Sequence, residues 1–276
     1  FDEQMQMQVA KRLLLENDLH RALVNGEFRL FFQPIMSTLT GAVVSVEALL
    51  RWQHPEKGLL LPADFIPIAE ETGLIVPIGA WVVEEACRLS QTWGILRDAK
   101  LPLGVAVNLS ARQLAQSDLV DTIKRIFSAT AFDPARIEFG FEVTETAVMC
   151  DPEAAANTLQ ALRDLGAHIS IDDFGTGYSS LAYLKRFPVD TLKVDRLFVM
   201  NLTDDKVDQA IVKSVTDLAH SMGLVVVAEG VETAEQAQIL RELNVDLLQG
   251  FLYARPLPAE QLEVLLGRSQ TSAVPA

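Results

Sequence analysis

Acidic, amide and basic side chains recur within or at the ends of apolar segments of this 276-residue chain. The positions that share this placement are Glu47, Asn108, Glu142, Asp172, Asp173, Lys193, Asp195, Glu229 and Gln249. A single acid at the end of a strand is usually a helix cap or a turn former. So many in succession favour a shared site instead. Carboxylate and amide oxygens suit hard divalent cations, Mg²⁺ or Mn²⁺, better than zinc or copper.

The adjacent pair Asp172 and Asp173 can serve two ions, one residue as a bridging and the other as a terminal ligand. Glu142 and Glu229 follow strongly apolar residues, where a carboxylate is costly to keep charged unless a cation lies nearby. Two-metal sites of this kind typically hydrolyse phosphate esters. The residues alone therefore predict metal-assisted chemistry on a phosphate ester.

Eight apolar, β-branched segments are expected to form the strands that position these residues. They are residues 28–35, 42–51, 103–109, 136–143, 167–172, 189–195, 223–229 and 245–249. Helical stretches separate them from the third segment onward. This pattern predicts an α/β fold, a (β/α)8 TIM-like barrel in which the carboxyl ends of the strands meet at one mouth.

The link between the first two predicted strands is a short turn, residues 37–41, which has no room for a crossover helix. One strand near the N-terminus is therefore expected to run antiparallel to the others. An open doubly wound sheet is the competing architecture. It would need a glycine-rich phosphate turn after its first strand, and the sequence has none.

Short patterns mark where several helices begin. Ser110 with Gln113, and Thr233 with Gln236, fit the capping box that precedes a helix. Asp151 stands before a proline, as an N-cap residue does before the first turn. These starts fall between the predicted strands, as an alternating barrel requires.

The composition excludes several classes of protein. The 23 Lys and Arg against 37 Asp and Glu give a net charge of −14, which disfavours binding to DNA or RNA duplexes and to anionic lipid. Cys87 and Cys150 cannot form a disulfide framework, and no Cys/His cluster indicates zinc. No apolar run approaches the roughly 20 residues that cross a membrane.

The chain is expected to have three parts. Residues 1–17 are predicted to be a linker helix from a preceding domain, residues 18–266 the main domain, and residues 267–276 a disordered tail. The sequence opens on Phe1 within this helical pattern, which suggests a fragment of a longer protein.

The segment Glu47-Ala-Leu-Leu-Arg51 resembles the signature of the EAL-domain cyclic di-GMP phosphodiesterases. Further matching segments are Gln33-Pro34, Asn108-Leu-Ser110, Glu142-Val-Thr-Glu145, the run 172–181, Lys193-Val-Asp195, the run 228–233 and Gln249-Gly250. The resemblance covers about residues 18–266, without departure at any position that the family uses for catalysis. It implies metal-dependent hydrolysis of cyclic di-GMP to linear pGpG, which lowers the level of this bacterial second messenger.

The resemblance also implies two ion sites that share Asp172. The ligands implied for the first ion are Glu47, Asn108, Glu142 and Asp172, and those for the second are Asp172, Asp173 and Glu229. Lys193 is expected to hold or activate the attacking water, so Lys193, Glu229 and Asp173 form the implied catalytic group. Ca²⁺ is expected to bind without supporting turnover, because its coordination is longer and looser.

Substrate contacts are implied at five positions. Arg51 is expected to bind a phosphate oxygen, and Gln33 and Gln249 to contact the substrate or waters of the site. Leu50 and Asp195 are assigned to the same substrate-binding group, with Asp195 expected to act from behind the residues that touch the ions.

Glu145 resembles the glutamate that anchors the loop 174–180. It lies three residues beyond Glu142, past the end of a strand, so the two side chains are not expected to reach the same ion. The glycines Gly175 and Gly177 permit the turns of that loop.

Two other functions remain open from the sequence. A receptor that binds cyclic di-GMP without hydrolysing it is one, although such relatives usually lose the signature glutamate or the paired aspartates. An enolase-like enzyme is another, because a barrel with carboxylate-bound Mg²⁺ and a lysine suits proton abstraction. The partners implied are cyclic di-GMP, a second copy in a homodimer, and a preceding sensor or diguanylate-cyclase-like domain. The domain is expected to face the cytoplasm.

Overall fold

The strands form one sheet. The computed structural model describes residues 15–96, 103–133, 137–175 and 181–271. The strands are β1 (Phe28–Ser37), β2 (Val43–His54), β3 (Gly58–Leu60), β4 (Gly104–Asn108), β5 (Phe139–Thr144), β6 (His168–Phe174), β7 (Thr191–Val194), β8 (Val225–Ala228), β9 (Leu247–Gln249) and β10 (Leu257–Pro258). Their order is β10-β1-β9-β8-β7-β6-β5-β4-β2-β3, and β1 also pairs with β2.

The pairing of β1 with both β2 and β9 closes the sheet into a barrel. β1 runs antiparallel to both neighbours, whereas the pairs from β2–β4 round to β8–β9 are parallel. The predicted (β/α)8 TIM-like barrel with one antiparallel strand is therefore confirmed, and the open doubly wound sheet is excluded. The short strands β3 and β10, which were not predicted from the sequence, extend the sheet by antiparallel pairing with β2 and β1 respectively.

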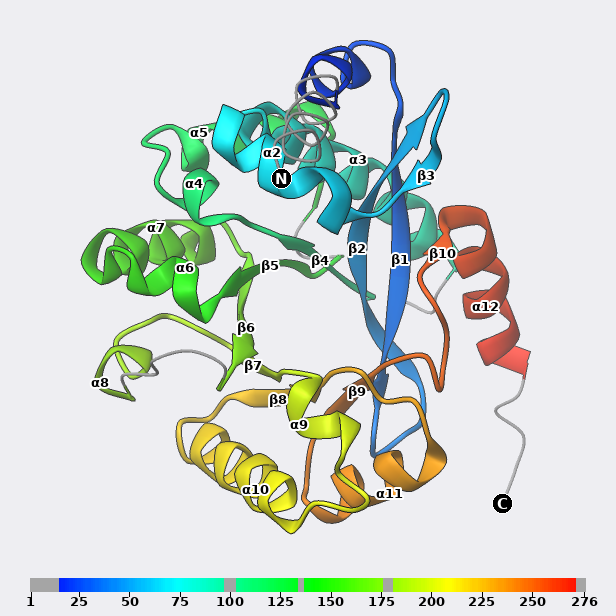
Figure 1. Ribbon diagram of the computed structural model, residues 1–276, viewed down its shortest axis with the longest axis vertical. Coiled ribbons are helices and arrows are strands. Elements are labelled where there is room, and N and C mark those ends of the chain that lie inside the picture. The colour runs from blue at the N-terminus through cyan, green and yellow to red at the C-terminus, as the bar shows by residue number, and fades with distance from the viewer. Residues whose placement is uncertain (1–14, 97–102, 134–136, 176–180, 272–276) are drawn as a thin grey trace, which may run out of the picture.

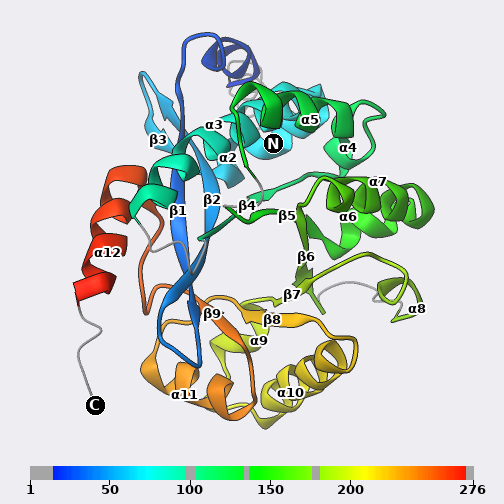
Figure 2. The same cartoon turned by 180° about the vertical axis from the view of Figure 1, so that it is seen from behind.

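Helices cover the outside of the barrel (Figure 1). They are α2 (Pro62–Thr72), α3 (Ile75–Leu96), α4 (Ala111–Leu114), α5 (Leu119–Ala129), α6 (Glu145–Met149), α7 (Pro152–Asp164), α8 (Leu181–Leu184), α9 (Leu197–Met200), α10 (Lys206–Ser221), α11 (Ala234–Glu242) and α12 (Ala259–Thr271). Seen from behind, α12 flanks β1, while α10 and α11 lie at the opposite end of the molecule from α2 and α3 (Figure 2). Among the described residues, no helix combines the length and apolar character that crossing a bilayer requires.

The pleat of each strand separates the packing residues from the polar ones. In β5, Phe139, Phe141 and Val143 are fully buried, and Phe139 packs edge-on against Phe127 of α5 with ring centroids 5.4 Å apart. Because successive residues of a strand point to opposite faces, Glu142 points the other way, into the barrel. The outer face of the strand therefore holds the helices, and the inner face is free to carry chemistry.

The predicted helix starts are present. Both capping boxes form, since Ser110 accepts from the backbone N–H of Gln113 and Thr233 from that of Gln236. Asp151 likewise accepts from a backbone N–H in the first turn of α7. These caps satisfy donors that the first turn of a helix leaves unpaired.

The secondary structure at the two ends of the described chain agrees only in part with the predicted linker helix and disordered tail. Residues 15–22 are helical, whereas the rest of the predicted linker helix, residues 1–14, lies outside the described residues. At the other end α12 continues to Thr271, so residues 267–271 of the expected disordered tail are helical. The helix therefore extends five residues beyond the expected boundary of the main domain.

Core packing gives a direct stability test. Leu159 of α7 is fully buried, and Leu39, in the turn between β1 and β2, is 91% exposed. Leu159→Ala is expected to lower the free energy of unfolding by about 2–5 kcal/mol, because it leaves a cavity under the helix. The same change at Leu39 is expected to alter it by less than about 0.5 kcal/mol. Chemical denaturation of both variants measures the difference, and equal losses would contradict the described packing.

Candidate active site

The polar residues singled out in the sequence converge at the carboxyl ends of the parallel strands. Neighbouring strands contribute Glu47 from β2, Asn108 from β4, Glu142 from β5 and Asp172 from β6, with Asn108 directly opposite Glu142 in the register. Lys193 comes from β7, Glu229 directly follows β8, and Gln249 ends β9. Barrel enzymes place their active sites at this end, so the strands bring these groups to a site of that kind.

Lys193 lies at the centre of the cluster. Its side chain is 1% exposed, and its Nζ lies 2.6 Å from Glu142 Oε2 and 2.6 Å from Glu229 Oε1. Glu47 Oε2 and Asp172 Oδ1 are each 3.7 Å from the same nitrogen. One buried ammonium is thus surrounded by four carboxylates.

This arrangement shifts the ionisation of its members in different directions. Burial lowers the pKa of Lys193, but the four surrounding carboxylates more than reverse this and hold the pKa well above its usual range. Burial raises the pKa of Glu142 far above that of an ordinary glutamate, despite the opposing charge of Lys193. Burial also raises the pKa of Glu229 to about 8. The cluster therefore holds more carboxylates than one lysine can neutralise.

Glu47 is held by two amide side chains. Asn108 Nδ2 donates to Glu47 Oε1 at 2.7 Å, and Gln249 Nε2 donates to Glu47 Oε2 at 2.6 Å. Burial raises the pKa of Glu47, but the charge of Lys193 and these two hydrogen bonds outweigh it and leave the pKa below its usual value. The signature glutamate is thus fixed in orientation and favoured in its charged form.

The amide chain continues from Gln249 to the antiparallel strand. Gln249 Nε2 also lies 3.2 Å from Gln33 Oε1, and Gln33 Nε2 donates to the backbone carbonyl of Ala254 at 3.2 Å. Both neighbours of Gln249 Nε2 are acceptors, which fixes the orientation of this amide. Among the described residues Gln249 Oε1 is buried without a hydrogen-bond partner, so it remains available to a donor within the site.

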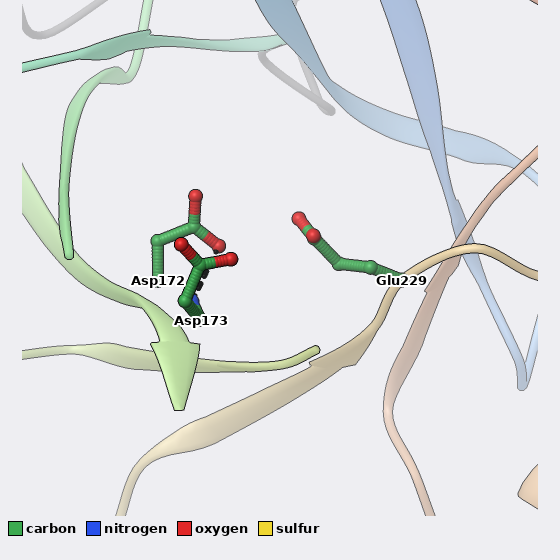
Figure 3. A group of neighbouring side chains, drawn as sticks. All are labelled: Asp172, Asp173 and Glu229. Carbon is green, nitrogen blue, oxygen red and sulfur yellow. Dashed lines mark hydrogen bonds between the residues drawn. The ribbon is translucent and has the colours of Figure 1, made fainter. Parts of the chain in front are cut away.

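Asp172, Asp173 and Glu229 form a group that can hold a metal ion. One oxygen from each lies within 4.8 Å of the others, and Glu229 extends toward the two aspartates from the opposite side (Figure 3). Asp173 has a φ of 55°, in the left-handed region, and its N–H donates to Asp172 Oδ1 at 2.9 Å. Burial and the charge of Asp172 raise the pKa of Asp173 to about 6. A divalent cation would relieve this repulsion between carboxylates.

The donor set fits Mg²⁺ or Mn²⁺. The group of Asp172, Asp173 and Glu229 offers only oxygen, and the second set, Glu47, Asn108 and Glu142, adds carboxylate and amide oxygens around Lys193. Hard divalent cations prefer such ligands. A bound cation would compensate the excess negative charge of this buried cluster, and this compensation favours binding.

Arg51 and Leu50, expected to bind substrate, lie on opposite faces of β2. Arg51 is buried, donates from Nη1 to the carbonyl of Leu50 at 2.8 Å, and has its guanidinium 5.6 Å from the Phe31 ring centre. Burial lowers the pKa of Arg51, and the charge of Glu47 opposes this. Arg51 is therefore a buried cation on the strand that carries Glu47.

The other two predicted residues are placed at the edge of the cluster. Asp195 Oδ1 accepts from the N–H of Leu197 at 2.7 Å, which orders the turn into α9. Glu145 is buried, and its Oε2 accepts from the N–H of Gly175 at 3.3 Å. The remainder of the loop that Glu145 was predicted to anchor, residues 176–180, lies outside the described residues.

A cavity of about 580 Å³ opens beside the cluster, and most of the residues in its wall were not predicted from the sequence. Glu47, Asn108 and Glu142 line one side, together with Leu50. The opposite wall is apolar and comes from α2 and α3; its members include Pro62, Ile66, Ile75, Ile78 and Val82. Such side chains look like ordinary core residues in a sequence, so no local signal distinguishes a cavity wall from packing.

A second feature without a sequence prediction follows Gln249. The ring of Phe251 is 47% exposed, and the guanidinium of Arg255 lies 4.3 Å from its centre. In the sequence, the only sign of this feature is an aromatic residue two positions after a polar strand end, which is a weak signal.

The fold and the site together define an α/β barrel with an antiparallel first strand and an acidic mouth whose oxygen groups could hold a metal ion. Residues 16–256 match the family model described as EAL domain. The chain belongs to the EAL domain family, as its signature segment predicted.

Relatives agree with this assignment. The bifunctional diguanylate cyclase/cyclic di-GMP phosphodiesterase MucR of Pseudomonas aeruginosa is 45% identical over 95% of this chain and 38% of its own length. The cyclic di-GMP phosphodiesterase PdeR of Escherichia coli is 41% identical over 95% of this chain and 39% of its own length. The chain thus spans well under half the length of these curated relatives.

Solved structures give the same result. The PaMucR phosphodiesterase in complex with c-di-GMP is 46% identical, with a TM-score of 0.85, over 90% of this chain and 99% of that one. The EAL enzyme Bd1971, in a form with cAMP and cyclic-di-GMP bound, is 35% identical with a TM-score of 0.87, over 94% of this chain and 70% of that one.

The raised carboxyl pKa values predict how stability depends on pH without divalent cations. Between its ordinary pKa of 4.5 and about 8, folded Glu229 keeps a proton that the unfolded chain has lost. Its contribution to stability is present at low pH and falls as the pH rises through this window. In EDTA, the free energy of unfolding is therefore expected to decline with pH less steeply in Glu229→Gln than in the wild type.

Urea denaturation at pH 5.5 and pH 8 measures both slopes. Glu232→Gln is the matched control, because Glu232 is exposed, and it is expected to keep the wild-type slope. A Glu229→Gln slope equal to that of the wild type would contradict the raised pKa.

Proposed function

We propose that this domain hydrolyses cyclic di-GMP to linear pGpG with two divalent cations, Mg²⁺ or Mn²⁺. The observation that carries the proposal is the acidic cluster around Lys193 at the mouth of an EAL barrel. Relatives that share this domain are named cyclic di-GMP phosphodiesterases, PdeR and NbdA among them. When bound, the ions would lower the pKa of a water and neutralise charge on the scissile phosphate.

The chain's own residues divide this work. Glu47, Asn108, Glu142 and Asp172 are proposed to hold the first ion, and Asp172, Asp173 and Glu229 the second. Glu47 suits its role because its two amide partners fix it and favour its charged form. The free acceptor of Gln249 suits an ordered water or a substrate N–H.

Substrate recognition is proposed to use the two features beside the cluster. The apolar cavity between β2 and the pair α2 and α3 can bury a flat base, with Leu50 in its wall. Phe251 offers an exposed ring on which a second base can stack. Arg51 and Lys193 supply the positive charge that a phosphodiester requires, with Lys193 facing the charge that develops on phosphate.

A cyclic di-GMP receptor without turnover is the second candidate, because the FimX EAL domain, 26% identical, has been solved bound to c-di-GMP. The presence of Glu47, Asp172 and Asp173 favours the enzyme. Incubation with cyclic di-GMP and Mg²⁺, Mn²⁺ or Ca²⁺ discriminates between them, with pGpG separated by chromatography. We expect product with Mg²⁺ and Mn²⁺ and none with Ca²⁺; binding without product under all three conditions would establish the receptor, and neither binding nor product would reopen the enolase-like alternative.

Three further parts of the proposal concern the setting of the domain. A homodimer, a preceding sensor or diguanylate-cyclase-like domain, and a cytoplasmic position are proposed from the family resemblance. Support for the second comes from MucR, which carries a diguanylate cyclase activity in its name and is much longer than this chain.

Glu47→Gln tests the metal shell. The amide keeps the shape of the side chain but loses the charge, so turnover of cyclic di-GMP is expected to fall at least about a hundredfold while the fold remains intact. Product formation and the thermal midpoint are the measurements. Glu232→Gln, an exposed glutamate in the segment after β8, is the control and is expected to retain the wild-type rate. Near-normal hydrolysis by Glu47→Gln would remove Glu47 from the ion sites.

Glu145→Ala tests the anchor of the segment after β6. The variant loses the acceptor for the N–H of Gly175, two residues from Asp173. Amide exchange at Gly175 is expected to accelerate, and the metal concentration that gives half-maximal rate to rise, since a second-ion ligand loses its support. Hydrogen exchange and metal titration provide the readouts.

Glu153→Ala, on the exposed side of α7, is the matched control for this anchor. If Glu145→Ala leaves both the Gly175 exchange rate and the metal requirement unchanged, Glu145 has no role in the mechanism.

A further inference from the structure

The ammonium of Lys193 occupies oxygens that the proposed ions also need. Its nitrogen lies 2.6 Å from Glu142 Oε2, an oxygen of the first ion site, and 2.6 Å from Glu229 Oε1, an oxygen of the second. Distances this short mark strong, charge-assisted hydrogen bonds. The lysine therefore bridges the two proposed ion sites through one ligand of each.

The geometry leaves little room for the lysine and an ion on the same carboxylate oxygen. Mg²⁺ binds carboxylate oxygen at about 2.1 Å, so an ion on Glu142 Oε2 would lie within about 4.7 Å of Lys193 Nζ. Two positive charges that close, with the lysine side chain 1% exposed, repel strongly because little water screens them. An ion on that oxygen therefore favours withdrawal of the ammonium.

Lys193 also reduces the repulsion among the carboxylates of the cluster when no ion is bound. Four carboxylates converge within 3.7 Å of one point, and without a cation among them their repulsion would oppose folding of the barrel mouth. Lys193 supplies that cation from within the chain. The group that stabilises the mouth without ions is thus the group that an ion must displace.

We propose that Lys193 is an internal counter-ion that competes with the divalent cations for Glu142 and Glu229, and so sets the metal concentration at which the site fills. This inference rests on the proposed two-ion function. Release from Glu142 also frees the ammonium to turn toward a substrate phosphate, so filling of the ion sites and positioning of the lysine are coupled events.

Lys193→Met tests the competition, because methionine keeps the unbranched apolar stem and removes the charge. The variant is expected to bind Mn²⁺ at least about tenfold more tightly than the wild type, a change of the size that one neighbouring charge exerts on a buried group. In EDTA its thermal midpoint is expected to fall below that of the wild type, and Mn²⁺ is expected to raise it by more. Calorimetric titration and thermal unfolding of the whole chain give both readouts without any assay of activity.

Lys213→Met is the matched control. Lys213 lies on α10, where it is partly exposed and paired with Asp217. This variant is expected to bind Mn²⁺ as the wild type does. Unchanged or weaker Mn²⁺ binding by Lys193→Met would overturn the proposal.

A second measurement uses the wild type, in case Lys193→Met does not fold in EDTA. In crystals grown with Mn²⁺, the distance from Lys193 Nζ to Glu142 Oε2 is expected to exceed about 3.5 Å, beyond a hydrogen bond. An ion bound to Glu142 with the 2.6 Å contact intact would overturn the competition.

Different results would overturn the two-ion function and the competition by Lys193. A wild-type chain that binds no Mn²⁺ would overturn the two-ion function and this inference with it. A wild type that binds Mn²⁺, with Lys193→Met binding it no more tightly, would overturn the inference alone.

Discussion

The burial of one ammonium among four carboxylates is the interaction on which the mouth of this barrel depends. Buried charges are tolerated only when they are paired and hydrogen-bonded, and Lys193 meets this condition through Glu142 and Glu229. The pairing is incomplete, because one positive charge faces several negative ones. Burial, together with the neighbouring carboxylates, raises the pKa of Glu142 and Glu229. A cation placed among these carboxylates would compensate the excess negative charge.

The barrel makes this cluster possible because the outer face of each strand packs against helices while the inner face carries polar side chains. Phe141 and Val143 of β5 are buried on the outer face of the strand, while Glu142 between them faces the interior. The same alternation in β7 buries Leu192 and Val194 on one face and presents Lys193 on the other. The apolar faces therefore supply the stability that an unbalanced acidic interior would otherwise remove.

The antiparallel strand β1 has a specific role in the site. It pairs with β2 on one side and β9 on the other, so Gln33 lies between Glu47 and Gln249. The charge of Lys193 and the hydrogen bonds of this amide chain outweigh burial and keep the pKa of Glu47 below its usual value, whereas burial and the charge of Asp172 raise the pKa of Asp173. Glu47 and Asp173 thus differ in ionisation, because amide donors stabilise the charge of Glu47 and a neighbouring carboxylate opposes the charge of Asp173.

The sequence by itself determined the barrel, its antiparallel strand, several helix caps and the residues of the acidic cluster. These features depend on the local hydrophobic periodicity and on the residue types at the ends of the strands. It did not determine that Lys193 would lie at the centre, or that Gln33, Gln249 and Asn108 would form one chain around Glu47. Nor did it distinguish the cavity wall of α2 and α3 from ordinary core, or predict the short strands β3 and β10. These features arise from contacts between segments far apart in the chain, and only the closed barrel decides which side chains meet there.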